Sequence, residues 1–309
     1  MENTPIIQVA YDAVMQTGES PLWHADEQVL YWVDIPARTV HRLDPASGAH
    51  HAWLLESEPA SLAIADSGGL IVATRNGVLH LDTASTGASA TDIGATEART
   101  TVIAPAPYDT AITRFNDGKV DGAGRYWIGT IYEPRDQPAA AMYVLEQGNL
   151  RCAWTGGMTN SNGLAFSPDQ KTMYHADTSA HLLRRFDYDV ATGTVGAEHV
   201  FRQFSADKAN NYGGRPDGGA VDSEGNYWSA LFEGARIVKL SPQGEVLAEI
   251  ALPVRCPTMV AFGGPNLRTL YITSAGARPA EELAQYPFSG KLLALQVDVA
   301  GRPEPAYRQ

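Results

Sequence analysis

Internal repetition constrains the fold of this chain more than any single motif does. Four segments begin a strand with an acid or an amide and continue through a turn into a strand rich in Tyr or Trp: GESPLWHADEQVLYW, RFNDGKVDGAGRYW, SNGLAFSPDQKTMY and RPDGGAVDSEGNYW. Two weaker copies, PASLAIADSGGLIVA and PTMVAFGGPNLRTLY, complete a set of six. The six equivalent positions are Glu19, Ala60, Asn116, Asn162, Asp217 and Thr258. Subtracting consecutive numbers gives spacings of 41, 56, 46, 55 and 41 residues, a length typical of four-stranded propeller blades.

The pattern within the copies predicts an all-β protein. Strand-like alternation is interrupted by turn signals, and 29 Gly and 19 Pro among 309 residues leave no long helical period. Only AEELAQY, residues 280–286, favours a helical turn. We therefore expect one six-bladed β-propeller domain over residues 1–309. The run PIIQVAYDAV should pair with GKLLALQVDV, so that strands from both ends of the chain close the ring.

Composition excludes several classes of partner. A net charge of −12 argues against a nucleic-acid surface, which needs clustered Lys and Arg. No apolar run approaches the roughly twenty residues of a membrane span, and the N-terminus lacks the pattern of a signal peptide. We expect a soluble, cytoplasmic protein that binds neither nucleic acid nor membrane, and a closed ring can stand alone as a monomer. Cys152 and Cys256 form no CxxC motif and are expected to be buried, inert thiols.

Familiar catalytic motifs are missing from the sequence. It contains no GxSxG elbow, no HExxH, no P-loop and no D-x-D-x-D-G calcium loop, and no two histidines stand at i and i+4. A serine-hydrolase or zincin mechanism therefore has little support.

The equivalent positions instead predict a metal site. If the repeats are blades, the oxygen-bearing side chains of Glu19, Asn116, Asn162 and Asp217 meet at the central axis, which suggests a hard divalent cation. Any one Asn-Gly or Asp-Gly pair is more often a turn than a ligand, but four in register favour convergence. Glu19 has no such turn chemistry, and two acids facing one axis repel each other unless a cation lies between them.

The same four motifs resemble the senescence marker protein (regucalcin) and gluconolactonase family. The matching segments lie at residues 18–35, 114–130, 161–169 and 215–228, and the blade pattern covers nearly the whole chain. The resemblance implies a six-bladed propeller and includes sugar-acid lactonases.

The resemblance also implies roles for individual residues. Glu19, Asn162 and Asp217 would bind one divalent metal, and Arg114 and Asn116 would contact the substrate. Some relatives carry an acid a few residues after the GT of the second motif. Here the sequence reads GTIYEPR, which makes Glu133 the nearest candidate for substrate binding.

The chemistry that these residues favour is metal-dependent hydrolysis of a sugar lactone, such as L-arabinono-, D-xylono- or D-glucono-lactone, to the sugar acid. Asp217 is the candidate general base, because a ligand carboxylate has a second oxygen that can accept a proton from water. The site could take Ca²⁺, Mg²⁺, Mn²⁺, Zn²⁺ or Fe²⁺. Two alternatives stay open: a calcium-binding regulatory protein without turnover, and a propeller that serves as an interaction platform.

Two segments are expected to cover the mouth of the site. One is a long loop over residues 94–114, and the other is QFSADKANNYGGR at 203–215, just before Asp217. Long ordered loops in compact domains tend to be functional.

Overall fold

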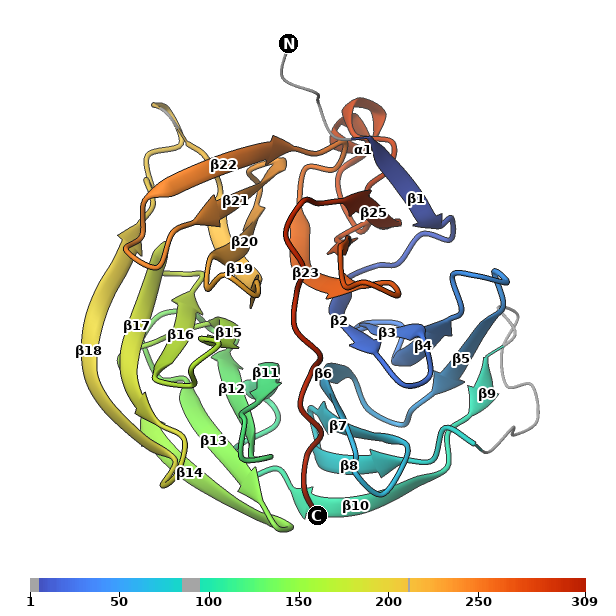
Figure 1. Cartoon of the computed structure of the whole chain (residues 1–309), viewed down its shortest axis with the longest axis vertical. Helices are drawn as coiled ribbons and strands as arrows, with labels where there is room; N and C mark the ends of the chain where they lie inside the picture. Colours follow the sequence, from blue (N-terminus) through green and yellow to red (C-terminus); the bar gives the residue numbers. More distant parts are fainter. Residues whose placement is uncertain (1–5, 85–94, 211) are drawn as a thin grey trace.

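The computed structural model describes residues 6–84, 95–210 and 212–309. These residues form six sheets of consecutive antiparallel strands arranged around a central axis (Figure 1). The predicted all-β, six-bladed propeller is therefore confirmed.

The blades are numbered in chain order, and the strands of each blade are given from the innermost to the outermost. Blade 1 contains β2 (Gly18–His24), β3 (Val29–Asp34), β4 (Thr39–Leu43) and β5 (His50–Leu54), with β9 (Thr96–Glu97) added in parallel at its edge. Blade 2 contains β6 (Pro59–Ile64), β7 (Leu70–Thr74), β8 (Gly77–Leu81) and β10 (Thr100–Pro105). Blade 3 contains β11 (Thr113–Val120), β12 (Tyr126–Tyr132), β13 (Ala141–Glu146) and β14 (Asn149–Thr155).

The second half of the ring follows the same order. Blade 4 contains β15 (Ser161–Phe166), β16 (Thr172–Asp177), β17 (Leu182–Asp189) and β18 (Thr194–Gln203). Blade 5 contains β19 (Arg215–Val221), β20 (Tyr227–Phe232), β21 (Arg236–Leu240) and β22 (Val246–Ala251). Blade 6 contains β23 (Pro257–Gly263), β24 (Thr269–Ser274), β25 (Leu292–Gln296) and β1 (Ile7–Tyr11).

The first and the last strands of the chain pair in blade 6. β1 pairs antiparallel with β25, and Ile7 stands opposite Leu295. The short helix α1 (Ala280–Gln285) lies in the connection from β24 to β25, within the stretch where the sequence favoured a helical turn. Hydrogen bonding of the first strand, β1, to the last strand, β25, ties the ring shut at blade 6.

Two expectations about local structure are wrong. The segment 94–114 is not one long loop, because β9 and β10 occupy residues 96–97 and 100–105 and β11 begins at Thr113; residue 94 lies outside the described residues. Both cysteines are free, as expected, but only Cys256 is buried. Cys152 is exposed because it lies on β14, the outermost strand of its blade.

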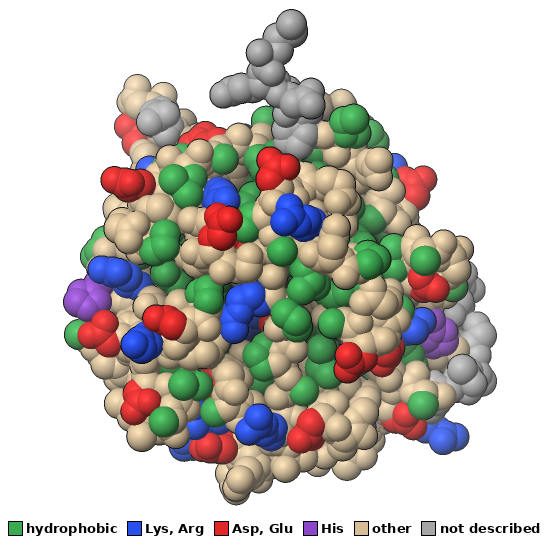
Figure 2. Space-filling model, in the orientation of Figure 1, with side chains coloured by type: hydrophobic (Ala, Val, Ile, Leu, Met, Phe, Trp, Pro, Cys, Tyr) green, Lys and Arg blue, Asp and Glu red, His purple; other side chains and the backbone are tan. Residues whose placement is uncertain are grey.

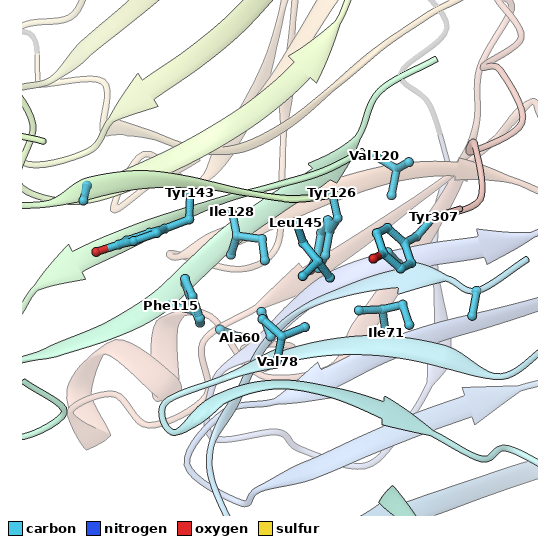
Figure 3. Close-up of a cluster of buried hydrophobic side chains, with 14 residues drawn as sticks. Ala60, Ile71, Val78, Phe115, Val120, Tyr126, Ile128, Tyr143, Leu145 and Tyr307 are labelled. Carbon is cyan, nitrogen blue, oxygen red and sulfur yellow. The ribbon is translucent and has the colours of Figure 1, made fainter. Parts of the chain in front are cut away.

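The hydrophobic core consists of separate layers between neighbouring blades. Between blades 2 and 3, for example, Ile71 and Val78 pack against Phe115, Ile128 and Tyr143 (Figure 3). Successive side chains of a strand point to opposite faces. Alternate residues of each strand therefore pack in the two apolar layers on either side of the blade. The blades therefore hold one another in place by apolar packing on both faces.

The last residues of the chain form a strap over one end of the ring. Residues 297–309 leave β25 and cross the face seen in Figure 1, drawn in dark red, to blade 2. Backbone hydrogen bonds join the strap to Leu267 and Ser223 of blades 6 and 5, to Gly124 of blade 3 and to Ile64 of blade 2. Basic and acidic side chains are interspersed with apolar ones over this face (Figure 2). The starts of the inner strands open at the opposite end.

No helix among the described residues is long and apolar enough to cross a membrane.

Candidate functional site

A bulge lies at the same place in all six inner strands. In β11 the pairing with β12 shifts between Phe115 and Gly118, and in β15 it shifts between Asn162 and Ala165. The remaining shifts fall between Glu19 and Leu22, Pro59 and Ser61, Pro216 and Gly219, and Pro257 and Val260. A bulge re-aims side chains by inserting an unpaired residue. The repeated motif therefore encodes a repeated local geometry at the mouth of the ring.

Asn116 connects the axial residues of blades 3 and 4. Its Nδ2 donates to Asn162 Oδ1 at 2.8 Å and to the Ser161 carbonyl at 2.8 Å. Asn162 in turn donates its Nδ2 to Thr178 Oγ1 at 2.7 Å. These contacts hold the Asn162 amide with its oxygen towards Asn116, and this oxygen retains a second lone pair for a ligand.

The candidate site contains three buried acidic side chains whose charges interact, those of Glu19, Asp117 and Asp217. Burial raises the pKa of Glu19 well above its usual value, and the charges of Asp217 and Asp117 raise it further. Burial likewise raises the pKa of Asp217 to about 8, with Asp117 adding to the rise. The pKa of Asp117 is raised to about 6, again mainly by burial. Removing such charges from water is costly unless a cation compensates them.

The predicted ligands fit a hard divalent cation. The carboxylate of Glu19 accepts a hydrogen bond from the backbone N–H of Ser20, at 3.0 Å, and forms no ion pair with a described residue. Carboxylate and amide oxygens are the donors that such ions prefer. Within the described ranges no three His, Cys, Asp or Glu side chains form a metal-binding group. The predicted set differs from such a group because one of its three members is the amide of Asn162.

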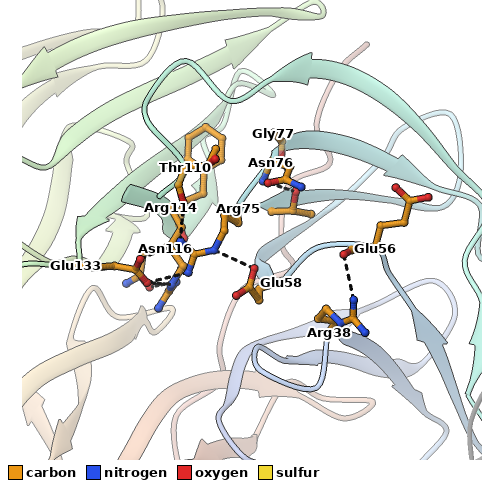
Figure 4. Close-up of polar contacts among 12 residues, drawn as sticks. Arg38, Glu56, Glu58, Arg75, Asn76, Gly77, Thr110, Arg114, Asn116 and Glu133 are labelled. Atoms are coloured by element: carbon orange, nitrogen blue, oxygen red, sulfur yellow. Dashed lines mark hydrogen bonds and ion pairs between the residues drawn. The ribbon is translucent and has the colours of Figure 1, made fainter. Parts of the chain in front are cut away.

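Arg114 and Glu133, the other predicted substrate contacts, lie together at the rim. Arg114 Nη1 donates to Asn116 Oδ1 at 2.9 Å, and its Nε lies 3.4 Å from Glu133 Oε1. Arg75 holds the same carboxylate through two hydrogen bonds of 2.9 Å, and its Nε donates to Glu58 at 2.9 Å (Figure 4). Hydrogen bonds from Arg75 are the main cause that lowers the pKa of Glu133. Hydrogen bonds and an ion pair thus join four of the six predicted site residues, Arg114, Asn116, Asn162 and Glu133. The other two, Glu19 and Asp217, interact with each other through their charges.

Sequence reasoning missed three residues of this region. Asp117 follows Asn116 directly, and the bulge allows both neighbours to lie at the axis. The signal was present in the motif RFND, but strict alternation would send Asp117 away from the site. Thr178 bridges Asn162 and the Pro216 carbonyl, and Arg75 reaches Glu133 across 58 residues of sequence. No short motif marks either of them.

The two segments expected to cover the mouth do border it. Thr110, between β10 and β11, accepts a hydrogen bond from Arg75 Nη1 through its carbonyl at 3.0 Å. In the second segment Tyr212 donates its hydroxyl to Glu233 at 2.8 Å; residue 211 lies outside the described residues.

Comparison with known proteins shows the family of the chain. The family model described as "SMP-30/Gluconolactonase/LRE-like region" matches residues 17–276. A 6-deoxy-6-sulfogluconolactonase of Pseudomonas putida is 45% identical over 291 residues, covering 94% of each chain. A pentonolactonase of Haloferax volcanii is 34% identical over 298 residues, covering 95% of each chain. A crystal structure described as a calcium-binding protein, regucalcin, from Agrobacterium tumefaciens has a TM-score of 0.88 and 28% identity, and the match covers 99% of this chain and 98% of that one.

The fold and site define a six-bladed propeller with an acid- and amide-lined axial site. The chain belongs to the SMP-30/gluconolactonase/LRE-like family, so the family resemblance seen in the four motifs is confirmed.

Proposed function

We propose that this protein is a metal-dependent lactonase that hydrolyses a sugar lactone to the sugar acid. The observation that supports the proposal is the hydrogen-bonded series Arg114, Asn116 and Asn162 at the same end of the ring as the buried, mutually interacting acids Glu19 and Asp217. The relatives named as lactonases over nearly the whole chain support it. L-arabinono-, D-xylono- and D-glucono-lactone are the candidate substrates, together with the sulfonated gluconolactone for which the P. putida relative is named.

Glu19, Asn162 and Asp217 would hold the metal ion. When bound, a divalent cation supplies a Lewis acid for ester hydrolysis. It would also favour the ionised forms of Glu19 and Asp217, which burial otherwise disfavours.

The remaining roles belong to side chains of this chain. Water attacks the lactone carbonyl carbon, the ring C–O bond breaks, and the departing ring oxygen takes up a proton to become a hydroxyl. Asp217 accepts the proton of the attacking water at a carboxylate oxygen. Arg114 and Asn116 donate hydrogen bonds to sugar oxygens, and Glu133 accepts them from sugar hydroxyls. Because Arg114 is tethered to Asn116 and Glu133, its donors are oriented before substrate arrives.

Proton release from a panel of aldonolactones tests the proposal. The enzyme is first treated with a chelator, and each divalent metal is then added back separately. We expect turnover only with metal, and we expect Asp217→Asn to lower kcat by about 10³-fold or more. Removing this buried acid should leave the melting temperature of the metal-free protein unchanged or higher. Normal turnover in a folded Asp217→Asn protein would contradict the mechanism.

The same experiment separates the alternative of a calcium-binding regulatory protein. The relative solved as a calcium-binding protein supports this alternative. Tight calcium binding by wild type without hydrolysis of any lactone, under any metal, would favour it over the lactonase.

A further inference from the structure

Arg215 occupies the same place in blade 5 as Arg114 occupies in blade 3. In β11, Arg114 lies two residues before Asn116 and stands opposite Ile131. In β19, Arg215 lies two residues before Asp217 and stands opposite Phe232. Both arginines precede the bulge of their strand by the same number of residues. By analogy with Arg114, which hydrogen-bonds Asn116 two residues further on, Arg215 lies two residues nearer the mouth than Asp217.

The guanidinium of Arg215 has unused hydrogen-bonding capacity. Its side chain is 22% exposed, and its Nε is buried with no hydrogen-bond partner among the described residues. Its Nη2 lies 3.6 Å from Glu233 Oε2, beyond hydrogen-bond distance, and its Cζ lies 5.2 Å from the ring centroid of Phe232. The guanidinium of Arg215 therefore forms no hydrogen bond at Nε and only a long ion pair at Nη2 with the described residues.

The charge of Arg215 is also incompletely neutralised. Glu233 is shared with Lys208, at 3.2 Å, and with Arg278, at 3.9 Å. Arg278 has a closer partner in Glu282, at 2.7 Å. Glu233 is therefore shared among three cations and pairs with Arg215 only in part.

Arg135, in the connection that follows β12 of blade 3, contributes a second cation at the mouth. It follows Glu133 by two residues, is exposed, and has no ion pair or side-chain hydrogen bond in the part of the chain that the structure describes. Both arginines lie at the end of the ring where the inner strands begin, Arg215 at the first residue of β19 and Arg135 three residues after the end of β12.

We propose that Arg215 and Arg135 form an anion subsite at the mouth, which binds a sulfonate, phosphate or carboxylate carried by the lactone at the end away from its reacting ester. This inference rests on the proposed lactonase function. A guanidinium matches the geometry of such oxyanions with paired N–H donors. Guanidinium groups at the mouth would also attract an anionic group of the substrate by charge.

The test compares kcat/KM of the metal-loaded enzyme for D-glucono-lactone and for analogues that carry sulfonate or phosphate on the terminal carbon. We expect wild type to prefer an anionic analogue by about tenfold or more, with a preference that shrinks as salt rises. Arg215→Gln and Arg135→Gln should each reduce the ratio of anionic to neutral kcat/KM by about tenfold, mostly through KM. Arg215→Lys keeps the charge and should retain part of the preference.

Arg38→Gln provides a matched control. Like Arg135, Arg38 is an exposed arginine between the second and third strands of its blade, and their φ angles are 58° and 57°. Its Nη1 donates only to the Glu56 carbonyl, at 3.3 Å. Its loss should leave the ratio unchanged.

A wild-type ratio near one, or a ratio that neither Arg215→Gln nor Arg135→Gln lowers, overturns the subsite. Calorimetric titration with gluconate, its sulfonated analogue and its phosphorylated analogue separates this failure from failure of the lactonase proposal. If wild type hydrolyses no lactone but binds an anionic acid more tightly through Arg215, the lactonase proposal fails and the subsite stands. If the charged acids bind no more tightly than gluconate, the subsite is rejected whatever the turnover. The tighter of the two charged acids identifies the preferred oxyanion.

Discussion

At the scale of single residues, the site depends on side chains that hold other side chains. Arg75 is the clearest example, because all its contacts are to neighbouring segments of the rim. It binds Glu133 with two hydrogen bonds, Glu58 with one, and the Thr110 carbonyl with another (Figure 4). It thereby joins the turn after β7 to the loop after β12 and fixes Glu133 beside Arg114.

We predict that Arg75→Gln raises KM for the preferred lactone by about tenfold, while kcat changes less. Without the bidentate contact the Glu133 carboxylate is free to swing, so that substrate must order it on binding. Steady-state kinetics with Arg38→Gln as the control measure this effect. An unchanged KM in Arg75→Gln would mean that Arg114 alone holds Glu133.

At the scale of elements, the bulges of the inner strands require unusual backbone at defined points. Gly163, in the bulge of β15, has a φ of 57°. A Cβ built there would meet Tyr227 Oη at 2.3 Å and the Asp217 carbonyl oxygen at 2.9 Å. The Tyr227 hydroxyl donates to the Gly163 carbonyl at 2.7 Å, which ties blade 5 to blade 4 directly beneath the site.

We predict that Gly163→Ala costs about 2–4 kcal/mol of stability and weakens metal binding. About 1 kcal/mol comes from the left-handed backbone, and the rest comes from displacement of Tyr227 and of the strand that carries Asp217. Gly148→Ala is the matched control, since Gly148 has a φ of 77° with no heavy atom within 4 Å of the added Cβ. Equal losses in the two variants, by thermal unfolding and metal titration, would exclude the close packing as the cause.

A histidine on β4 predicts a pH dependence of stability. His41 is 6% exposed, lies against Trp32 with ring planes 8° apart, and shares a hydrogen bond with His50 at 3.0 Å. Burial, and secondly the charge of His50, lowers the pKa of His41 to about 3. The folded state therefore binds fewer protons than the unfolded state between this value and the ordinary pKa of about 6.5.

The stability that neutral His41 contributes is present above about pH 6.5 and is lost as pH falls towards 3. We predict that lowering the pH from about 7 to about 5 reduces the unfolding free energy of wild type by about 2 kcal/mol relative to that of His41→Gln. Urea unfolding at a series of pH values measures this difference, which should be constant above pH 7. A constant difference down to pH 5 would show that His41 titrates in the folded protein.

The sequence predicts strands well where the same pattern recurs in several repeats. The six axial positions all fall in inner strands, because alternation and turn signals recur in every copy. The repeats were recognised from their inner strands. β10 was missed because it is the outermost strand of blade 2, which lies outside the shared motif, and β9 is an extra strand at the edge of blade 1. Arg75 and Thr178 were missed for another reason. Their partners are chosen by the packing of one blade on the next, which no local pattern records.

At the scale of the whole molecule, the two ends of the ring have different tasks. The candidate site lies where the inner strands begin, and the strap of residues 297–309 crosses the end where they finish (Figure 1). Lys119 at the end of β11 pairs with Glu304 of the strap, and Arg302 donates to the Ser167 carbonyl of blade 4 at 3.3 Å. The strap thus adds contacts between blades without touching the site.

Tyr307 is the main anchor of the strap. It is fully buried in the layer between blades 2 and 3, and its hydroxyl accepts a hydrogen bond from the Gly148 N–H at 2.7 Å (Figure 3). Its backbone N–H donates to the Ile64 carbonyl, and its carbonyl accepts from Asp66. One residue therefore links the strap to two blades at once.

We predict that Tyr307→Ala lowers the free energy of unfolding by about 3–5 kcal/mol, as expected for loss of a large buried aromatic side chain. Tyr307→Phe should cost only about 1–3 kcal/mol, because the Gly148 N–H alone loses its partner. Well below the melting temperature both variants should keep wild-type KM and metal affinity, since the site is built at the other end of the inner strands. Denaturant unfolding and metal titration on the same samples separate the two effects. If Tyr307→Ala weakens metal binding while its blades remain folded, the strap and the site are coupled through the inner strands, and the ring does not divide into a structural end and a chemical end.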